Sequence, residues 1–244
     1  MKRHIYGPRA AQEALSASPR DVQVLLVSIT EGSLRPELLA AARAAGVPVE
    51  ERAMSALDAL SGGVRHQGVV AVLGRDYPYR ELPELITGDL SGALLVALDE
   101  VTDPHNFGAI VRSAVAFGAT GVVTLKDRAA PVTPVVVRAS AGATEHCRIA
   151  RVTNLARTLE AFRAKDLRVV GLDAEGSAAL EAVDLTGPVA LVVGSEGRGL
   201  RRLVREGCDV LARLPLPGPI ASLNASVAAS CALYEVTRQR RAGS

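Results

Sequence analysis

The part of this chain that most constrains its fold covers residues 188–229. It opens with an apolar run over residues 189–193, which is typical of a buried strand. Three glycines follow within the next six residues, 194–199. A short helix over residues 200–206 and a second strand over residues 210–214 come next. The pattern therefore predicts two strands, of which the first ends in a loop rich in glycine.

The second of these strands also ends in a loop of special composition, with Pro215, Pro217, Gly218 and Pro219. The last helix then opens at residues 222–224. Glycine lets main-chain groups approach a ligand closely, and proline restricts the shapes that a loop can adopt. Open α/β sheets bind ligands at such strand ends. The two loops together therefore predict a small-molecule site.

The first part of the chain predicts a compact α/β unit at residues 1–75. Its expected strands are residues 22–29, 47–50 and 67–73, and its expected helices are residues 8–15, 35–45 and 53–60. Residues 76–92 hold prolines and glycines and predict a linker with one short helical turn. We expect the second domain over residues 93–244.

Strands and helices also alternate in the second domain. Expected strands are residues 93–98, 121–125 and 169–172, and expected helices are residues 109–117, 134–141 and 154–165. Residues 101–108 are polar and predict a loop, and Arg112 would lie one turn into the helix that follows. This alternation predicts an α/β fold in which helices cover both faces of a parallel sheet.

Composition narrows the possible classes of protein. No apolar run approaches the roughly 20 residues of a membrane span, and residues 1–10 lack the apolar core of a signal peptide. The three cysteines are widely spaced and predict neither disulfides nor a zinc site. We therefore expect a cytoplasmic protein with no metal. The net charge of +2 argues only weakly for nucleic acid.

Three stretches resemble, in order and spacing, the motifs of the SpoU (TrmH) family of RNA ribose 2′-O-methyltransferases. They are DPHNFGAIVRSA, VVGSEGRGL and LPLPGPIASLNASVAA. Four further stretches are similar to the branch that methylates a guanosine ribose in large-subunit (23S) ribosomal RNA. These are IYGPRAAQEAL, HQGVVAVL, ASAGATEH and ARVTNLARTLEAF. The resemblance covers nearly the whole chain.

The resemblance implies a specific architecture and chemistry. It implies a small, ribosomal-protein-like α/β domain that binds RNA, followed by a catalytic α/β domain whose carboxyl end forms a deep trefoil knot. It also implies S-adenosylmethionine as methyl donor and a homodimer. Nothing in the periodicity of the sequence predicts a knot, because knots are almost absent from proteins.

The resemblance also assigns roles to single residues. Arg112 carries over as the catalytic residue, although a guanidinium stays protonated in proteins, so it could instead orient an RNA phosphate and stabilise the alkoxide. Asn106 carries over as the residue that shapes the site around it. Glu196 either helps to bind the cationic sulfonium or organises its loop. Ser222 and Asn224 match the third motif, and Ser222 is also placed to cap the last helix. The expected donor site comprises Gly194, Glu196, Gly199, Leu214, Ile220, Ser222, Leu223 and Asn224.

Several alternatives remain open. The same three motifs occur in enzymes that methylate transfer RNA or a ribosomal site of antibiotic resistance. A non-catalytic RNA-binding protein would be expected to lose the polar motif residues, which are all present here. A nucleotide-phosphate enzyme is disfavoured, because GSEGRG lacks the Lys-Ser/Thr ending of a phosphate-binding loop.

Overall fold

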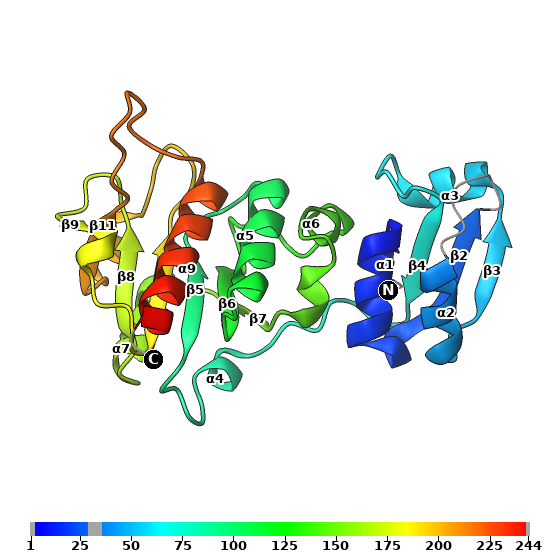
Figure 1. Cartoon of the computed structure of the whole chain (residues 1–244), viewed down its shortest axis with the longest axis horizontal. Helices are drawn as coiled ribbons and strands as arrows, with labels where there is room; N and C mark the ends of the chain where they lie inside the picture. The colour runs from blue at the N-terminus through cyan, green and yellow to red at the C-terminus, as the bar shows by residue number, and fades with distance from the viewer. Residues whose placement is uncertain (1–2, 29–35, 243–244) are drawn as a thin grey trace. The chain divides into compact units, whose positions relative to one another are not determined.

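The computed structural model describes residues 3–28 and 36–242, and Figure 1 traces their helices and strands. The chain forms two compact units. The first comprises the described residues up to Pro78 together with Val132–His146, and the second comprises Tyr79–Pro131 and the described residues from Cys147 onward. The sequence pattern predicted one break, near residues 76–92. The structure instead returns a segment from the middle of the chain to the first unit.

The first unit is built on a four-stranded mixed sheet in the order β1-β4-β2-β3. The strands are β1 (Arg3–Tyr6), β2 (Val22–Ser28), β3 (Val49–Arg52) and β4 (Val69–Leu73). The helical segments are α1 (Pro8–Ala17), η1 (Pro19–Asp21), α2 (Pro36–Ala44) and α3 (Met54–Ser61). The sequence pattern predicted the last three strands and the three α-helices but not β1. Residues 29 and 35, predicted at element ends, lie outside the described residues.

The returning segment holds α6 (Pro134–Ala139) and η2 (Ala143–His146) and packs against β1 and α1. Val137 is almost fully buried in the core of the first unit. The carboxylate of Glu145 accepts two hydrogen bonds from the Arg3 guanidinium, at 3.0 and 2.7 Å. Gly142 has a φ of +87°, and an added Cβ would lie 2.9 Å from the Cα of Ala10. Only glycine fits this close approach.

The second unit is built on a seven-stranded parallel sheet in the order β7-β6-β5-β10-β8-β11-β9. The strands are β5 (Leu94–Leu98), β6 (Gly121–Leu125), β7 (Ile149–Val152), β8 (Arg168–Leu172), β9 (Ala178–Ala179), β10 (Val189–Val193) and β11 (Val210–Arg213). This arrangement confirms the predicted α/β fold with a parallel sheet. The trefoil knot stays a prediction.

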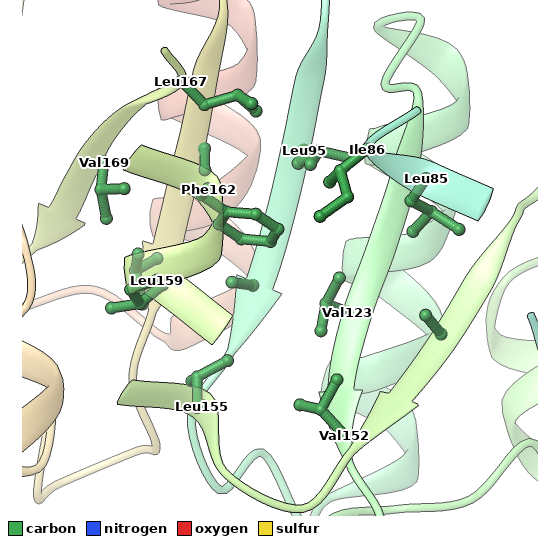
Figure 2. Packing of buried hydrophobic residues seen from close by; sticks show 14 of the residues in the cluster. Leu85, Ile86, Leu95, Val123, Val152, Leu155, Leu159, Phe162, Leu167 and Val169 are labelled. Atoms are coloured by element: carbon green, nitrogen blue, oxygen red, sulfur yellow. The ribbon is translucent and has the colours of Figure 1, made fainter. Parts of the chain in front are cut away.

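Helices cover both faces of this sheet. They are α4 (Leu82–Leu85), α5 (Pro104–Ala116), α7 (Leu155–Arg163), η3 (Leu180–Ala182), α8 (Arg202–Glu206) and α9 (Ala225–Ala242). Figure 2 shows α7 in front of the sheet, where Phe162 and Leu159 face Leu95 and Val169, and α5 and α9 behind it. Helix α9 packs along α5. None of the helices in the described ranges is long and apolar enough to cross a membrane.

Two helices begin elsewhere than the sequence pattern predicted. Helix α5 begins at Pro104, so part of the expected loop over 101–108 is helical. Asp103 caps it by accepting a hydrogen bond from the His105 N–H at 3.0 Å, and a proline at the first position is a common helix start. Helix α9 begins at Ala225, where Asn224 rather than Ser222 accepts from the Ser226 N–H at 2.9 Å. The predicted cap at Ser222 is therefore wrong.

Candidate active site

A cavity of about 880 Å³ opens where β8, β10 and β11 end, at the carboxyl edge of the parallel sheet. Three loops line it: residues 172–175, 193–199 and 213–225. All eight residues predicted to bind the donor line this cavity, namely Gly194, Glu196, Gly199, Leu214, Ile220, Ser222, Leu223 and Asn224. Their contribution to binding stays a prediction. The strand order explains why segments far apart in sequence meet here, because β8 lies between β10 and β11.

The glycine-rich loop after β10 folds back on itself. Ser195 and Gly199 exchange two main-chain hydrogen bonds, with N···O distances of 3.2 and 3.0 Å. Gly197 and Gly199 have φ of 79° and 66°, which glycine adopts without steric cost. An added Cβ on Gly194 would lie only 2.3 Å from the carbonyl carbon of Gly199. The loop is therefore a tight turn that offers main-chain groups to the cavity.

A cluster of three polar side chains lies beside this turn. The Asn106 amide donates to Glu196 Oε2 at 3.2 Å, and the Asn224 amide donates to Glu196 Oε1 at 2.6 Å. The Asn224 amide also donates to Asn106 Oδ1 at 2.9 Å. Each residue comes from a different predicted motif, and α5, the glycine-rich turn and the start of α9 supply one each. The cluster fixes the orientation of the Glu196 carboxylate at the edge of the cavity.

The structure does not bring every predicted catalytic residue into this cluster. Ser222 lines the cavity but is exposed and lies outside the hydrogen-bonded triplet. Arg112 lies in the third turn of α5, because that helix begins five residues earlier than predicted. Its side chain is exposed, and within the described ranges it forms no hydrogen bond or ion pair. Arg112 is therefore an exposed cation that pairs with no carboxylate of the described residues.

An ion pair with a buried carboxylate anchors the end of the glycine-rich turn. Asp99, at the end of β5, is fully buried and accepts from the main-chain N–H of Arg201 at 2.8 Å and from its Nε at 2.7 Å. The hydrogen bond that the Arg201 guanidinium donates to Asp99 raises the pKa of this guanidinium, so the group stays charged. Removing Arg201 would leave the buried Asp99 carboxylate without a counter-charge, which is strongly destabilising.

Sequence reasoning missed the contribution of the loop after β8. Asp173 and Glu175 line the cavity, and Asp173 pairs with Arg205 at 3.3 Å. Arg213 donates to the carbonyl oxygens of Gly176 and Ser177 at 2.7 and 2.9 Å, which holds this loop against β11. The sequence does show an acidic loop at the end of a predicted parallel strand, which is a common place for ligand-binding residues. This was not enough to place the loop at the cavity, because the sequence does not give the order of the strands in the sheet.

The sequence of this chain is similar to those of known RNA methyltransferases. Residues 93–234 match the family described as SpoU rRNA Methylase, and residues 4–78 match the family described as RNA 2′-O ribose methyltransferase substrate binding. The chain is 44% identical over 242 residues to the 23S rRNA (guanosine-2′-O-)-methyltransferase RlmB of Pseudomonas putida, covering 97% of this chain and 96% of that protein. It is 50% identical over 198 residues to an uncharacterized tRNA/rRNA methyltransferase of Mycobacterium sp. strain KMS, covering 80% of this chain and 63% of that protein.

The fold is also similar to solved structures of RNA methyltransferases. The chain is similar to the SpoU methyltransferase AviRb of Streptomyces viridochromogenes, solved in complex with the cofactor AdoMet. The two share 29% sequence identity and superpose with a TM-score of 0.81, covering 99% of this chain and 92% of AviRb. Because it covers 99% of this chain, the similarity extends over both compact units.

Proposed function

The chain belongs to the SpoU rRNA methylase family, and from this membership we propose that it methylates the ribose of a guanosine in 23S ribosomal RNA. The chain is an S-adenosylmethionine-dependent RNA 2′-O-methyltransferase. The target nucleotide, a guanosine of 23S ribosomal RNA, is a more specific proposal than the reaction itself. It is supported by the identity to RlmB of Pseudomonas putida, which extends over nearly the full length of both chains.

The cavity at the carboxyl edge suits the methyl donor. Its tight glycine turn and proline-rich loop offer main-chain hydrogen-bonding groups, and Leu214, Ile220 and Leu223 offer apolar contacts to an adenine ring. The Glu196 carboxylate gives a negative charge for a cationic sulfonium. When bound, S-adenosylmethionine supplies an activated methyl group. We assign the eight cavity residues predicted from the sequence to donor binding.

The observation that carries the proposal is the triplet Asn106–Glu196–Asn224 at the edge of this cavity. The two amides hold the carboxylate in one orientation, so the groups that meet the reacting atoms need little rearrangement during the reaction. Such preorganisation is a major source of enzymatic rate. We propose that Asn106, Glu196, Ser222 and Asn224 shape the site in which the ribose hydroxyl meets the methyl group.

Arg112 has a separate part in this proposal. A ribose hydroxyl is a poor nucleophile and must lose its proton as it attacks. Arg112 orients an RNA phosphate and stabilises the developing alkoxide, while another group or water takes the hydroxyl proton. Its exposed position, without a carboxylate partner in the described part of the chain, leaves its donors available to RNA.

We also propose a homodimer that forms through α9. One face of this helix, with Ala225, Ala229 and Ala232, is buried in its own chain. Another carries Val227, Cys231 and Tyr234, which follow one another at helical spacing and are all exposed. A second copy of the chain would cover this apolar stripe. A cytoplasmic location follows from a ribosomal RNA substrate.

Mapping of ribose methylation tests the function. We expect 23S ribosomal RNA from cells that lack the protein to lose methylation at one guanosine, and the purified protein to restore it with S-adenosylmethionine. The Glu196→Ala variant is the negative control. It lacks the carboxylate at the centre of the triplet and should not restore methylation. Restored methylation on transfer RNA instead would make the choice of ribosomal RNA wrong while leaving the reaction intact.

A further inference from the structure

A second cavity, of about 380 Å³, opens at the same carboxyl edge of the parallel sheet. Three arginines line it, Arg128 from the loop after β6 and Arg201 and Arg202 at the start of α8. The remaining lining residues are Thr153, Asn154, Ala156, Leu203 and Val204. No carboxylate is among the described residues that line it. The cavity therefore presents cationic and neutral hydrogen-bonding groups.

Two of the arginines form ion pairs with acidic residues, which fix the positions of their side chains. Arg128 pairs with Glu100 at 2.8 Å, and Arg201 pairs with Asp99 at 2.6 Å. The side chain of Asp99 is fully buried and that of Glu100 is 15% exposed, whereas the Arg128 side chain is 67% exposed. The two carboxylates thus lie away from solvent, and the Arg128 guanidinium faces it. The Arg201 side chain is 35% exposed and also lies 3.3 Å from Glu100.

Two of the three other polar lining residues, Arg202 and Asn154, have hydrogen-bond donors that the described residues leave unused. The Arg202 side chain is 76% exposed and pairs with Glu206, one helical turn away and outside the cavity lining. Asn154 uses its side-chain oxygen to cap α7, where it accepts from the Arg157 N–H at 3.1 Å. Its amide nitrogen has no partner among the described residues and is a further donor at the rim.

The cavity adjoins the candidate active site along the chain. Gly199 lines the first cavity and Arg201 lines the second, so the glycine-rich turn separates them. On its other side, Glu100 holds Arg128 and lies three residues before Asp103, the cap of the helix that carries Asn106. An RNA strand whose ribose reaches the polar triplet would pass this edge of the sheet.

We propose that the cavity lined by Arg128, Arg201 and Arg202 binds a backbone phosphate of the substrate RNA, on a nucleotide that flanks the methylated ribose. This inference rests on the proposed function. Arginine is suited to this ligand, because its planar fork can donate two parallel hydrogen bonds to a phosphate. A phosphate contact fixes the register of the strand without reading its sequence. The cavity therefore positions the RNA, and the triplet beside it holds the reacting ribose.

The test uses the full chain with Arg128→Gln, Arg202→Gln and the double variant. Arg201 is left unchanged, because its ion pair with Asp99 supports the fold. Arg163→Gln is the matched control, since Arg163 is an exposed arginine at the opposite end of α7. The Kd for a 23S RNA fragment is measured at several salt concentrations, together with the KM for RNA, kcat and the Kd for S-adenosylmethionine.

We expect the double variant to bind RNA roughly tenfold more weakly, because an exposed ion pair with phosphate, which contributes only modestly to affinity, is lost at each position. The dependence of log Kd on log salt should become shallower by about one unit for each arginine removed. The KM for RNA should rise by a similar factor, and the Kd for S-adenosylmethionine should stay unchanged. The control variant should match the unmodified chain in every measurement.

Other outcomes would overturn the proposal. Unchanged RNA affinity and salt dependence in the double variant would do so. So would inorganic phosphate that binds the unmodified chain but not the double variant while RNA affinity stays equal, since the cavity would then serve a free anion. An unmodified chain that binds RNA but transfers no methyl group would instead contradict the proposed function, and the binding measurements would still decide on the cavity.

Discussion

At the scale of single residues, Gly194 is the described glycine whose added Cβ would meet the closest atom. A methyl group there would lie 2.3 Å from the carbonyl carbon of Gly199 and 2.6 Å from the main-chain nitrogen of Leu200. These are main-chain atoms of a closed turn, so no flexible side chain can move aside. We expect Gly194→Ala to destabilise the protein by about 1–3 kcal/mol, the usual cost of overpacking, and to weaken donor binding strongly. Thermal unfolding and calorimetric titration with S-adenosylmethionine measure both effects.

Gly218 offers a matched control in the same cavity. It lies in the proline-rich loop, and an added Cβ would have no heavy atom within 4 Å. Gly218→Ala should therefore leave stability and donor affinity close to those of the unmodified chain. Equal losses in the two variants would mean that the shape of the glycine-rich turn is not what the donor requires.

Arg112 tests how charge is used in the reaction. If it acts on the transition state, Arg112→Ala should lower kcat by about 10²–10³-fold, the usual cost of one lost electrostatic stabiliser, with donor affinity nearly intact. Arg112→Lys keeps the charge but loses the planar fork, so it should also fail if a phosphate is held in bidentate fashion. Single-turnover rates and donor titration separate these effects.

Two results would contradict this account of Arg112. Activity largely restored by lysine would mean that charge alone suffices. Loss of donor binding in Arg112→Ala would make the residue a support of the pocket. Arg112 is exposed and is not among the residues that line the cavity, which argues for retained donor binding.

The candidate site was predictable where motif and chemistry coincide in one residue. Asn106, Glu196 and Asn224 were each predicted, and the structure joins them by hydrogen bonds. Asp173 was not predicted, because its place in the cavity depends on the position of β8 between β10 and β11. Strand order is a long-range property, and local patterns do not carry it.

At the scale of elements, helix starts were less predictable than helix existence. The polar residues of the first motif suggested a loop, yet Asp103 and Pro104 together begin α5 five residues earlier. The short strand β1 also escaped prediction, because its four residues include Arg3 and His4 and lack an apolar run. It forms only because β4 offers an open edge for antiparallel pairing.

The exposed stripe on α9 gives a prediction for this helix. Val227 is 46% exposed and Tyr234 is 57% exposed. If a second copy covers them, Val227→Asp should convert a dimer into a monomer, since it places a charge in an apolar interface. Light scattering at micromolar concentration measures the change. A monomeric unmodified chain would contradict the proposed dimer.

The three cysteines offer an independent readout of the same interface. Burial raises the pKa of Cys147 to about 12, and burial also raises that of Cys208 to about 12. Both thiols therefore stay protonated and unreactive near pH 8. Cys231 is exposed on the stripe. Alkylation followed by mass spectrometry should label Cys231 faster in Val227→Asp than in the unmodified dimer, with Cys147 and Cys208 as internal controls.

At the scale of the whole molecule, the returning segment Val132–His146 alters what a fragment can do. The domain limits predicted from the sequence imply that a fragment starting near Leu90 binds the donor and loses most RNA affinity. The structure buries Val137 and the side chain of Glu145 within the first unit. That fragment would expose both. We expect it to aggregate or to unfold at lower temperature than the full chain.

A second fragment separates this effect from donor binding. Replacing Val132–His146 in the same fragment by a glycine-serine linker of equal length removes the exposed apolar residues. This fragment should stay monodisperse and bind S-adenosylmethionine. If the first fragment behaves equally well, the buried contacts of the returning segment contribute little to stability.

The returning segment also limits how such enzymes can acquire a new target RNA during evolution. A recognition module that ends at a single junction can be transferred between proteins as one piece of gene. Here the chain passes between the two units three times, after Pro78, after Pro131 and after His146. Recombination at one boundary would separate Glu145 from Arg3 and Gly142 from α1. A change of target RNA in this architecture therefore requires gradual substitution within the unit, or two coordinated grafts, and laboratory chimeras face the same requirement.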